Sequence, residues 1–308
     1  MKALITGAEG FLGHYLVPEL EGNGYETVRC TLPPQEGYTT MDILKPDQVR
    51  EVIAKEKPDV IFHLAGQSNV GISWKQPALT METNAVGFIN VLDAVREVNP
   101  QMRVVAIGSS DEYGNLREAG DNVTEEVAVH PMTPYAASKV AQENIGLLYN
   151  RAYRMNICMV RSFNHGAAHQ IRGFMLTDFA SGIAEIEAGK REVLKVGNLD
   201  SARDFTHAKD AVRAYRLIAE KGRAGEIYNV GSGKPYRAQE ILDRMIALAK
   251  CEIRVEQDPA RMRPSDTPVI RCNHDRLTED TGWMPELTMD DIVSDVLNDW
   301  RARIAKGE

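Results

Sequence analysis

A serine, a tyrosine and a lysine stand in an order that could transfer protons. Tyr135 and Lys139 lie four residues apart in the stretch PYAASKVAQE, so a helix would place them on one face. A tyrosine with its ordinary pKa of about 10 gives up its proton poorly at neutral pH. A neighbouring ammonium group favours the phenolate and lowers that pKa. Ser109, which ends an apolar stretch upstream, can hydrogen-bond the reacting oxygen. Because Tyr-x-x-x-Lys also occurs by chance, the surrounding elements must decide.

A glycine-rich turn near the N-terminus provides a second signal. The stretch TGAEGFLG places Gly7, Gly10 and Gly13 between an apolar strand pattern at 2–6 and a helical pattern at 11–20. In that context glycines permit a tight turn, the close approach of a pyrophosphate and close packing of helix on strand. A simple connecting turn is the alternative, but the strand–helix context favours dinucleotide binding.

The second predicted strand indicates less clearly which dinucleotide binds. An acid at its end would bind the ribose 2′-hydroxyl of NAD, yet this strand ends VRCTL. Arg29 could pair with the 2′-phosphate of NADP or be a solvated surface arginine. The sequence therefore favours NADP(H) and leaves NAD(H) open. In MDIL, Asp42 and the adjacent Ile43 are candidates for the adenine pocket, and a surface aspartate is the alternative.

Strands and helices alternate along the first half of the chain. Strand patterns lie at 2–6, 25–32, 58–65, 102–110 and 155–164, and helical patterns lie at 11–20, 45–57, 77–98 and from 134 onward. This alternation indicates parallel βαβ units, and the continuously apolar strands indicate helices on both faces. We expect an α/β fold, a doubly wound parallel Rossmann sheet with a smaller, mostly helical C-terminal substrate lobe. Ligands bind at the carboxyl ends of such strands, so Ser109 and Tyr135 belong on the ligand side.

The alternation weakens after about residue 164. One helix–strand unit at 208–231 returns to the sheet, and the other patterns there are helical. We predict a dinucleotide-binding domain of residues 1–164 plus 205–232. The substrate-binding lobe then comprises residues 165–204 plus 233–308.

Composition narrows the class of partner. The net charge of -8 argues against binding to the backbone of a nucleic acid, which needs a basic surface. The four cysteines form no close pair, so they indicate neither a disulfide framework nor a metal site. The sequence shows neither a signal peptide nor an apolar run long enough for a membrane span. We expect a cytoplasmic protein that does not interact with membranes.

The order of these motifs is similar to that of the extended short-chain dehydrogenase/reductase family, over nearly the whole chain. Further segments narrow the resemblance: HLAGQSNV, RSFNH, VGNLDSARDFTHAKDAVRAY, YNVGSG and RMRPSD. Together they resemble the GDP-4-keto-6-deoxy-D-mannose reductases and, more distantly, the GDP-mannose 4,6-dehydratases. The resemblance implies NAD(P)-dependent reduction of a GDP-linked 4-keto sugar, giving GDP-D-rhamnose from GDP-4-keto-6-deoxy-D-mannose.

The resemblance also assigns roles to individual residues. It implies a catalytic triad of Ser109, Tyr135 and Lys139. The implied cofactor contacts are Gly7, Gly10, Phe11, Gly13, Leu64, Ala65, Gly66, Tyr135, Lys139 and His165. The implied substrate contacts are Ser68, Ser110, Asp111, Asn164, Arg203, Arg263 and Asp266. Structural alternatives are that His165 caps a strand end, that Arg203 pairs with Asp204, and that Arg263 is a surface residue.

The sequence departs from the family at three places. A GPGQ loop is replaced by GAAHQ, and His207 replaces an acid, so we expect His207 to be a surface residue. Dehydratases place a glutamate two residues after the catalytic hydroxyl, where this chain has the shorter Asp111 followed by Glu112. This favours a reductase over a dehydratase, although Glu112 could reach the site by another path. An epimerase and a non-catalytic NAD(P)-binding protein are further alternatives.

Two helical patterns predict a homodimer. Apolar residues cover more than one stripe of each pattern: Val86, Phe88, Val91, Val140, Ile145 and Leu148. A helix that is apolar beyond one face is buried on more than one side. The resemblance implies that these two helices of each subunit form the interface.

Overall fold

The computed structural model describes residues 1–114, 122–261 and 269–307. Its main sheet has seven parallel strands in the order β11-β7-β5-β4-β1-β2-β3. The strands are β1 (Lys2–Thr6), β2 (Glu26–Thr31), β3 (Thr39–Thr40), β4 (Val60–His63), β5 (Arg103–Ile107), β7 (Ile157–Ser162) and β11 (Ile227–Val230). Strands β4 and β7 are buried along their whole length, as apolar strands covered on both faces should be. The predicted doubly wound sheet is confirmed.

Helices cover both faces of this sheet. Helices α1 (Gly13–Gly22), α8 (Ala208–Lys221) and α10 (Asp275–Thr281) share a core that includes Leu16, Tyr215 and Leu277. Helices α2 (Pro46–Glu56), α5 (Gly87–Val98) and α6 (Pro134–Tyr153) cover the other face, with Val49 and Phe88 in the second core. None of the described helices is long and apolar enough to cross a membrane.

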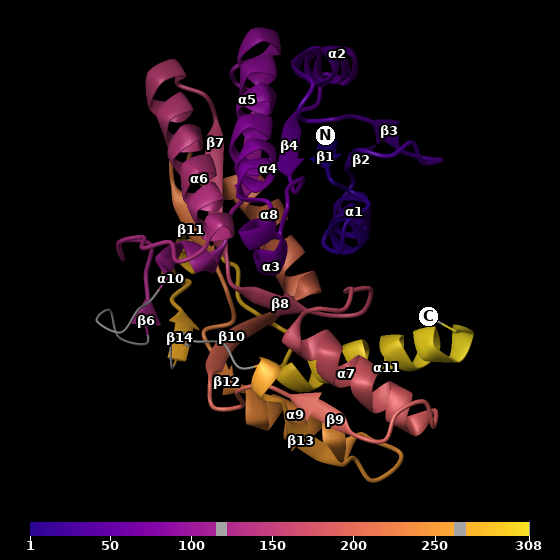
Figure 1. Cartoon of the computed structure of the whole chain (residues 1–308). Helices are drawn as coiled ribbons and strands as arrows, with labels where there is room; N and C mark the ends of the chain where they lie inside the picture. Colours follow the sequence, from indigo (N-terminus) through magenta and orange to yellow (C-terminus); the bar gives the residue numbers. More distant parts are fainter. Residues whose placement is uncertain (115–121, 262–268, 308) are drawn as a thin grey trace.

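A third core lies below the main sheet in Figure 1 and belongs to the predicted substrate lobe. It is built from α7 (Met175–Glu187), α9 (Ala238–Ala247) and α11 (Met289–Lys306). The lobe also contains short strands: β8 (Asn164–Gly166), β9 (Leu194–Val196), β10 (Ala202–His207), β12 (Pro235–Arg237), β13 (Val255–Gln257) and β14 (Val269–Cys272). Strand β6 (Asn122–Val123), from the segment before α6, pairs with β14. The sequence pattern missed most of these strands, because they are short and pair with distant segments. The exact domain boundaries stay a prediction.

The long helix predicted at 77–98 is interrupted. It consists of α4 (Pro77–Met81), one turn of π-helix, η1 (Glu82–Val86), and then α5. A short helix, α3 (Val70–Lys75), precedes it. Single π-turns inside helices often accompany functional sites. This one contains Asn84, whose side chain is fully buried.

His207 is not a surface residue, so that expectation was wrong. It is 1% exposed and caps the N-terminus of α8, where its Nδ1 atom accepts a hydrogen bond from the Lys209 N–H at 3.1 Å. Its Nε2 atom lies 3.0 Å from a carboxylate oxygen of Asp295 on α11. Because His207 caps α8 and also contacts α11, its side chain is shielded from solvent.

The GAAHQ loop, residues 166–170, contacts both α1 and α11. The Tyr15 hydroxyl of α1 donates to the Ala168 carbonyl at 3.0 Å, and the His169 N–H donates to Asp299 of α11 at 3.0 Å. The His169 ring stacks on His14 with 5.1 Å between ring centroids. The loop therefore joins the first helix of the main sheet to the last helix of the lobe.

Candidate active site

The glycine turn has the backbone geometry that a pyrophosphate-binding turn needs. Gly7 has a φ of +67°, and a Cβ there would lie 2.9 Å from backbone atoms of Ala65. At Gly13, a Cβ would overlap the Ala8 carbonyl, so helix α1 can pack close to the turn only with glycine. Gly10 is exposed between them. The turn and the N-terminus of α1 therefore fit the dinucleotide that the sequence predicts.

The end of β4 lies next to this turn. The Leu64 N–H donates to the Thr6 carbonyl at 3.2 Å, and the Ala65 N–H donates to the Thr6 hydroxyl at 3.0 Å. At Gly66, an added Cβ would lie 3.7 Å from the Lys139 ammonium nitrogen. The predicted cofactor residues 64–66 thus connect the glycine turn to the predicted catalytic lysine.

The structure brings Ser109, Tyr135 and Lys139 together. Ser109 follows β5 and caps the 3₁₀ helix η2 (Ser110–Tyr113), while Tyr135 and Lys139 lie in the first turns of α6. The Ser109 side chain lies near enough to Tyr135 to lower the pKa of the tyrosine. The Lys139 ammonium donates to the Ile107 carbonyl and to the Gln142 side chain, each at 2.9 Å. Buried side chains with these partners are held in a fixed arrangement.

Burial controls the acidity of this triad. Burial raises the pKa of Tyr135 well above its ordinary value, and the charge of Asp111 raises it further, against the effect of Ser109. Burial also lowers the pKa of Lys139 to about 8, which the charge of Glu112 partly opposes. The sequence predicted a tyrosine whose pKa is lowered by lysine; burial is the larger effect here. Tyr135 therefore keeps its proton at neutral pH.

Glu112 is directed into the protein. It is 0% exposed, and its Oε1 atom accepts the Ser109 N–H at 2.8 Å. Its Oε2 atom lies 3.9 Å from the Arg161 Nε and accepts no hydrogen bond from the described residues. Burial, with the nearby charge of Glu143, raises the pKa of Glu112. The alternative path by which Glu112 would serve as a dehydratase acid/base therefore has no support in this geometry, whereas Asp111 is exposed.

Sequence analysis missed Asn84 as a residue of the site. Its Nδ2 atom donates to the Ser138 hydroxyl at 2.8 Å, and its Oδ1 atom accepts the Gln67 N–H at 2.7 Å. The π-turn thus fixes the loop after β4 against the helix that carries Tyr135 and Lys139. The signal available was an asparagine in the middle of a long apolar helical pattern, which is an unfavourable place for its amide.

Strand β8 brings the substrate lobe to the cofactor turn. His165 stacks on Phe11 with 5.7 Å between ring centroids, and its Nδ1 atom lies 3.1 Å from the Phe163 carbonyl. Burial lowers the pKa of His165, which favours the neutral ring. Asn164 is exposed at the start of the strand. Both predicted residues therefore lie where the turn and the lobe meet.

The remaining predicted substrate residues lie on several elements. Arg203 lies on β10, which pairs with β8. Asp204, the alternative partner of Arg203, is buried and accepts the N–H groups of Ser232, Gly233 and Cys272. Two further candidates are Ser68, exposed before α3, and Ser110, which is 8% exposed in η2. Arg263 and Asp266 lie outside the described residues.

The candidates for the adenosine end lie apart from the triad. The Arg29 guanidinium pairs with Glu21 at 2.7 Å, near the C-terminal end of α1 and away from the glycine turn. Asp42 follows β3 and accepts the Leu44 N–H at 2.9 Å. Ile43 is 7% exposed and packs where Gly87 leaves room for it. Contact of Arg29 with a cofactor would require the pair with Glu21 to break.

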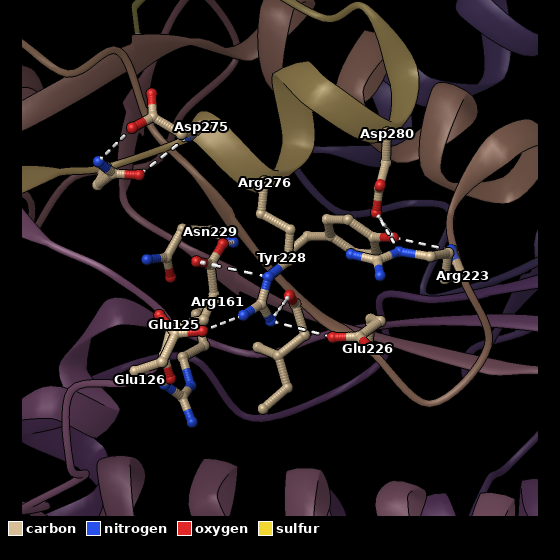
Figure 2. Close-up of polar contacts among 12 residues, drawn as sticks. Glu125, Glu126, Arg161, Arg223, Glu226, Tyr228, Asn229, Asp275, Arg276 and Asp280 are labelled. Atoms are coloured by element: carbon tan, nitrogen blue, oxygen red, sulfur yellow. Dashed lines mark hydrogen bonds and ion pairs between the residues drawn. The ribbon is translucent and has the colours of Figure 1, made fainter.

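A polar cluster around Arg276 contacts the segment that begins at β6 (Figure 2). Arg276 of α10 contacts Glu125, Glu126 and Glu226, and Arg161 donates to the Glu125 carbonyl at 3.1 Å. The Glu125 carboxylate also accepts the Asn229 N–H. These charges are paired with one another, so the cluster holds α10, β11 and the β6 segment together.

Comparison with known proteins identifies the family. The chain matches the family model described as GDP-mannose 4,6 dehydratase over residues 33–296. The chain belongs to this family. It is 34% identical to the GDP-6-deoxy-D-mannose reductase of Pseudomonas aeruginosa over 304 residues, covering 98% of each chain. It is 24% identical to the GDP-mannose 4,6-dehydratase of Vibrio cholerae, covering 96% of this chain and 92% of that relative.

A solved structure supports the same family assignment. The structure of RMD from Pseudomonas aeruginosa complexed with NADPH matches with a TM-score of 0.90 and 32% identity, covering 98% of this chain and 99% of that chain. The predicted resemblance to the extended short-chain dehydrogenase/reductases, and within them to the GDP-sugar reductases and dehydratases, is confirmed.

Proposed function

We propose that this protein reduces the 4-keto group of GDP-4-keto-6-deoxy-D-mannose to give GDP-D-rhamnose. The observation that carries the proposal is the grouping of Ser109 with the buried side chains of Tyr135 and Lys139 at the carboxyl edge of the sheet. The 34% identity to a GDP-6-deoxy-D-mannose reductase supports this choice of substrate. A reduced nicotinamide cofactor supplies the hydride when it is bound. The NADPH-bound relative favours NADP(H), with NAD(H) as the alternative.

Each residue of the triad has a distinct part in this reduction. Tyr135 donates its proton to the 4-oxygen as the carbonyl becomes a hydroxyl, and its raised pKa keeps that proton available. Ser109 hydrogen-bonds the same oxygen and orients the sugar. The Lys139 ammonium compensates the charge of the phenolate that remains. Asn84 is a positioning residue, because it fixes both the loop after β4 and α6.

The geometry favours reduction over dehydration. Dehydration needs a further acid/base that removes the C5 proton and expels the C6 hydroxyl. The residue in the dehydratase position is Asp111, whose side chain is one methylene shorter than glutamate. Glu112 is buried and bound to the Ser109 N–H. The second candidate, GDP-mannose 4,6-dehydratase, rests on the family match and on the relative from Vibrio cholerae.

The nucleotide end of the substrate belongs to the lobe. The resemblance assigns the diphosphate to Arg203 and the later nucleotide contacts to Arg263 and Asp266. Asn164 and His165 face the sugar and the cofactor in this assignment. A cytoplasmic homodimer formed through α5 and α6 completes the proposal.

One assay tests the function. The purified protein is incubated with GDP-4-keto-6-deoxy-D-mannose and either NADPH or NADH, and the loss of reduced cofactor is followed while the sugar product is identified. Stoichiometric consumption that yields GDP-D-rhamnose is the expected result. Conversion of GDP-mannose without net cofactor use would instead identify a dehydratase, and cofactor binding without turnover on any nucleotide sugar would indicate a non-catalytic protein.

A further inference from the structure

Gln142 lies one turn after Lys139 on α6 and is 0% exposed. Its side-chain oxygen accepts a hydrogen bond from the Lys139 ammonium at 2.9 Å, and its amide nitrogen donates to the Ile107 carbonyl at 3.3 Å. The same Ile107 carbonyl accepts from the Lys139 ammonium at 2.9 Å. The three groups therefore form a closed triangle of hydrogen bonds between α6 and the last residue of β5.

This triangle uses two of the three N–H donors of the ammonium group. The ammonium nitrogen also lies close to the end of β4, because a Cβ added at Gly66 would lie 3.7 Å from it. The predicted cofactor residues 64–66 lie on this side. One N–H of Lys139 thus stays available for a bound cofactor, while the other two fix the position of the nitrogen.

The ammonium needs these acceptors because the site is buried. Lys139 is 6% exposed, and burial lowers its pKa to about 8, against the charge of Glu112. Burial keeps the nearby His63 ring of β4 neutral by lowering its pKa to about 3, and the charge of Lys139 adds to this effect. Tyr135 keeps its proton. Because a hydrogen bond to the charged form of a group favours that form, Gln142 stabilises the ammonium without adding a charge to the site.

We propose that Gln142 is a positioning residue of the reduction, which holds the Lys139 ammonium in its charged form and fixes it against the end of β5. The proposal rests on the proposed function, in which Lys139 compensates the charge of the phenolate. A glutamine suits this role because its amide has both an acceptor for the ammonium and a donor for the Ile107 carbonyl. A leucine offers neither, and an ionised carboxylate offers only the acceptor.

An NMR titration of the unliganded full chain tests this proposal without turnover. The ¹³Cε resonance of Lys139, assigned by its loss in Lys139→Arg, is followed as a function of pH. Gln142→Leu lowers the midpoint by about one pH unit or more, as expected for the loss of a hydrogen bond to a charged group. Gln142→Glu places a carboxylate beside the ammonium and raises the midpoint. Because burial raises the pKa of Glu112 to about 8, both variants are also measured in the Glu112→Gln background, where the two shifts persist.

Tyr149→Phe is the matched control, because it removes a different hydrogen bond between α6 and a neighbouring helix, from the Tyr149 hydroxyl to Asp93 of α5. It leaves the midpoint within about 0.3 pH units of wild type. An unmoved midpoint in Gln142→Leu overturns the proposal. The same lowering in both Gln142 variants also overturns it, because altered packing and not the amide oxygen would then be responsible.

Steady-state rates test the orienting part of the proposal. They are measured well below the midpoint of each protein, where Lys139 is charged with or without Gln142. The kcat of Gln142→Leu falls roughly ten-fold there, while the KM for the sugar nucleotide stays within about two-fold of wild type. A wild-type kcat under these conditions overturns the orienting role. If the midpoints shift as stated but wild type turns over no nucleotide sugar, the proposed function fails while the contact of Gln142 with the ammonium stands.

Discussion

The backbone N–H of Ser109 donates to the Oε1 atom of Glu112 at 2.8 Å, so a fully buried carboxylate holds the start of η2. Glu112→Leu leaves that N–H without its partner and should destabilise the fold by about 1–3 kcal/mol. Glu112→Gln keeps an acceptor and should retain most of that stability. Urea unfolding of both variants measures the difference. Equal stability of the leucine and glutamine variants would contradict a role for this hydrogen bond.

Glu112 should also affect the pH profile. Burial raises the pKa of Glu112 to about 8, and the ionised form of Glu112 raises the pKa of Lys139 against the larger effect of burial. Glu112→Gln removes the charge, so the alkaline limb of kcat/KM should move to lower pH even though the fold is kept. A purely structural role would leave that limb in place. Comparing the two Glu112 variants therefore separates the hydrogen bond from the charge.

Lys139 should set the alkaline limit of activity. Its pKa is lowered by burial to about 8, and the proposed role requires the ammonium form. Tyr135, with its raised pKa, keeps the proton that it donates. The kcat/KM for reduction should therefore be level below about pH 8 and fall above it. Lys139→Arg keeps a positive charge throughout this range. The residual kcat/KM of this variant should therefore no longer fall above about pH 8. An unchanged limb in that variant would assign it to another group.

Tyr135→Phe removes the proposed acid and leaves the ring in place. Cofactor binding should stay nearly intact, because the glycine turn carries the pyrophosphate. Turnover should fall about 10²–10⁴-fold, the usual contribution of a positioned acid. Steady-state rates, combined with a cofactor titration, measure both effects. Activity within a few-fold of wild type would remove Tyr135 from the mechanism.

The main sheet could be predicted from the sequence because short stretches of neighbouring residues determine most of its elements. Strands β1, β4, β5 and β7 are short, mostly apolar runs, and the Gly7 turn joins β1 to α1 within a few residues. The two-residue edge strand β3 has no such pattern and was not predicted. The order of Ser109, Tyr135 and Lys139 then follows from the rule that ligands bind at carboxyl strand ends. These features depend on residue type and spacing, which the sequence displays directly.

Other features depend on contacts between distant segments. From the sequence, His207 is expected at the surface. In the fold, Asp295 of α11 contacts its ring. Strand β14 forms only by pairing with β10 and β6. The burial that raises the pKa of Tyr135 likewise comes from tertiary packing, which the sequence does not display. None of these has a periodic local pattern.

The proposed dimer has a smaller apolar surface than the sequence indicated. Phe88 and Val91 are fully buried in the core of the subunit, whereas Val86 is 44% exposed and Leu148 is 54% exposed. Leu148→Glu places a charge in the proposed interface and should give a monomer by light scattering at micromolar concentration. Leu248→Glu is the matched control, at a leucine that is 46% exposed near the end of α9. A monomeric wild type, or the same loss in both variants, would contradict this interface.

Substitution of Arg203 should weaken substrate binding much more than it slows the chemical step. The substrate carries a diphosphate while the chain has a net charge of -8, so local cations must hold it. Arginine suits this role because its planar fork donates two parallel hydrogen bonds to phosphate oxygens. Losing a hydrogen bond to a charged group costs about 1.5–3 kcal/mol, which corresponds to roughly 10–150-fold in binding. Because the diphosphate lies far from the transferred hydride in this assignment, Arg203→Ala should raise KM by that factor and change kcat much less.

The control for Arg203 is Arg254→Ala, which removes an exposed arginine of the lobe that pairs with Glu256. Its kinetics should match wild type. Arg203→Lys keeps the charge but lacks the fork, so its KM should lie between those of wild type and Arg203→Ala. Cofactor affinity should be unchanged in all three variants, because the cofactor pyrophosphate belongs to the Gly7 turn. If Arg203→Ala lost cofactor affinity and kept the KM for the sugar nucleotide, Arg203 would belong to the cofactor site.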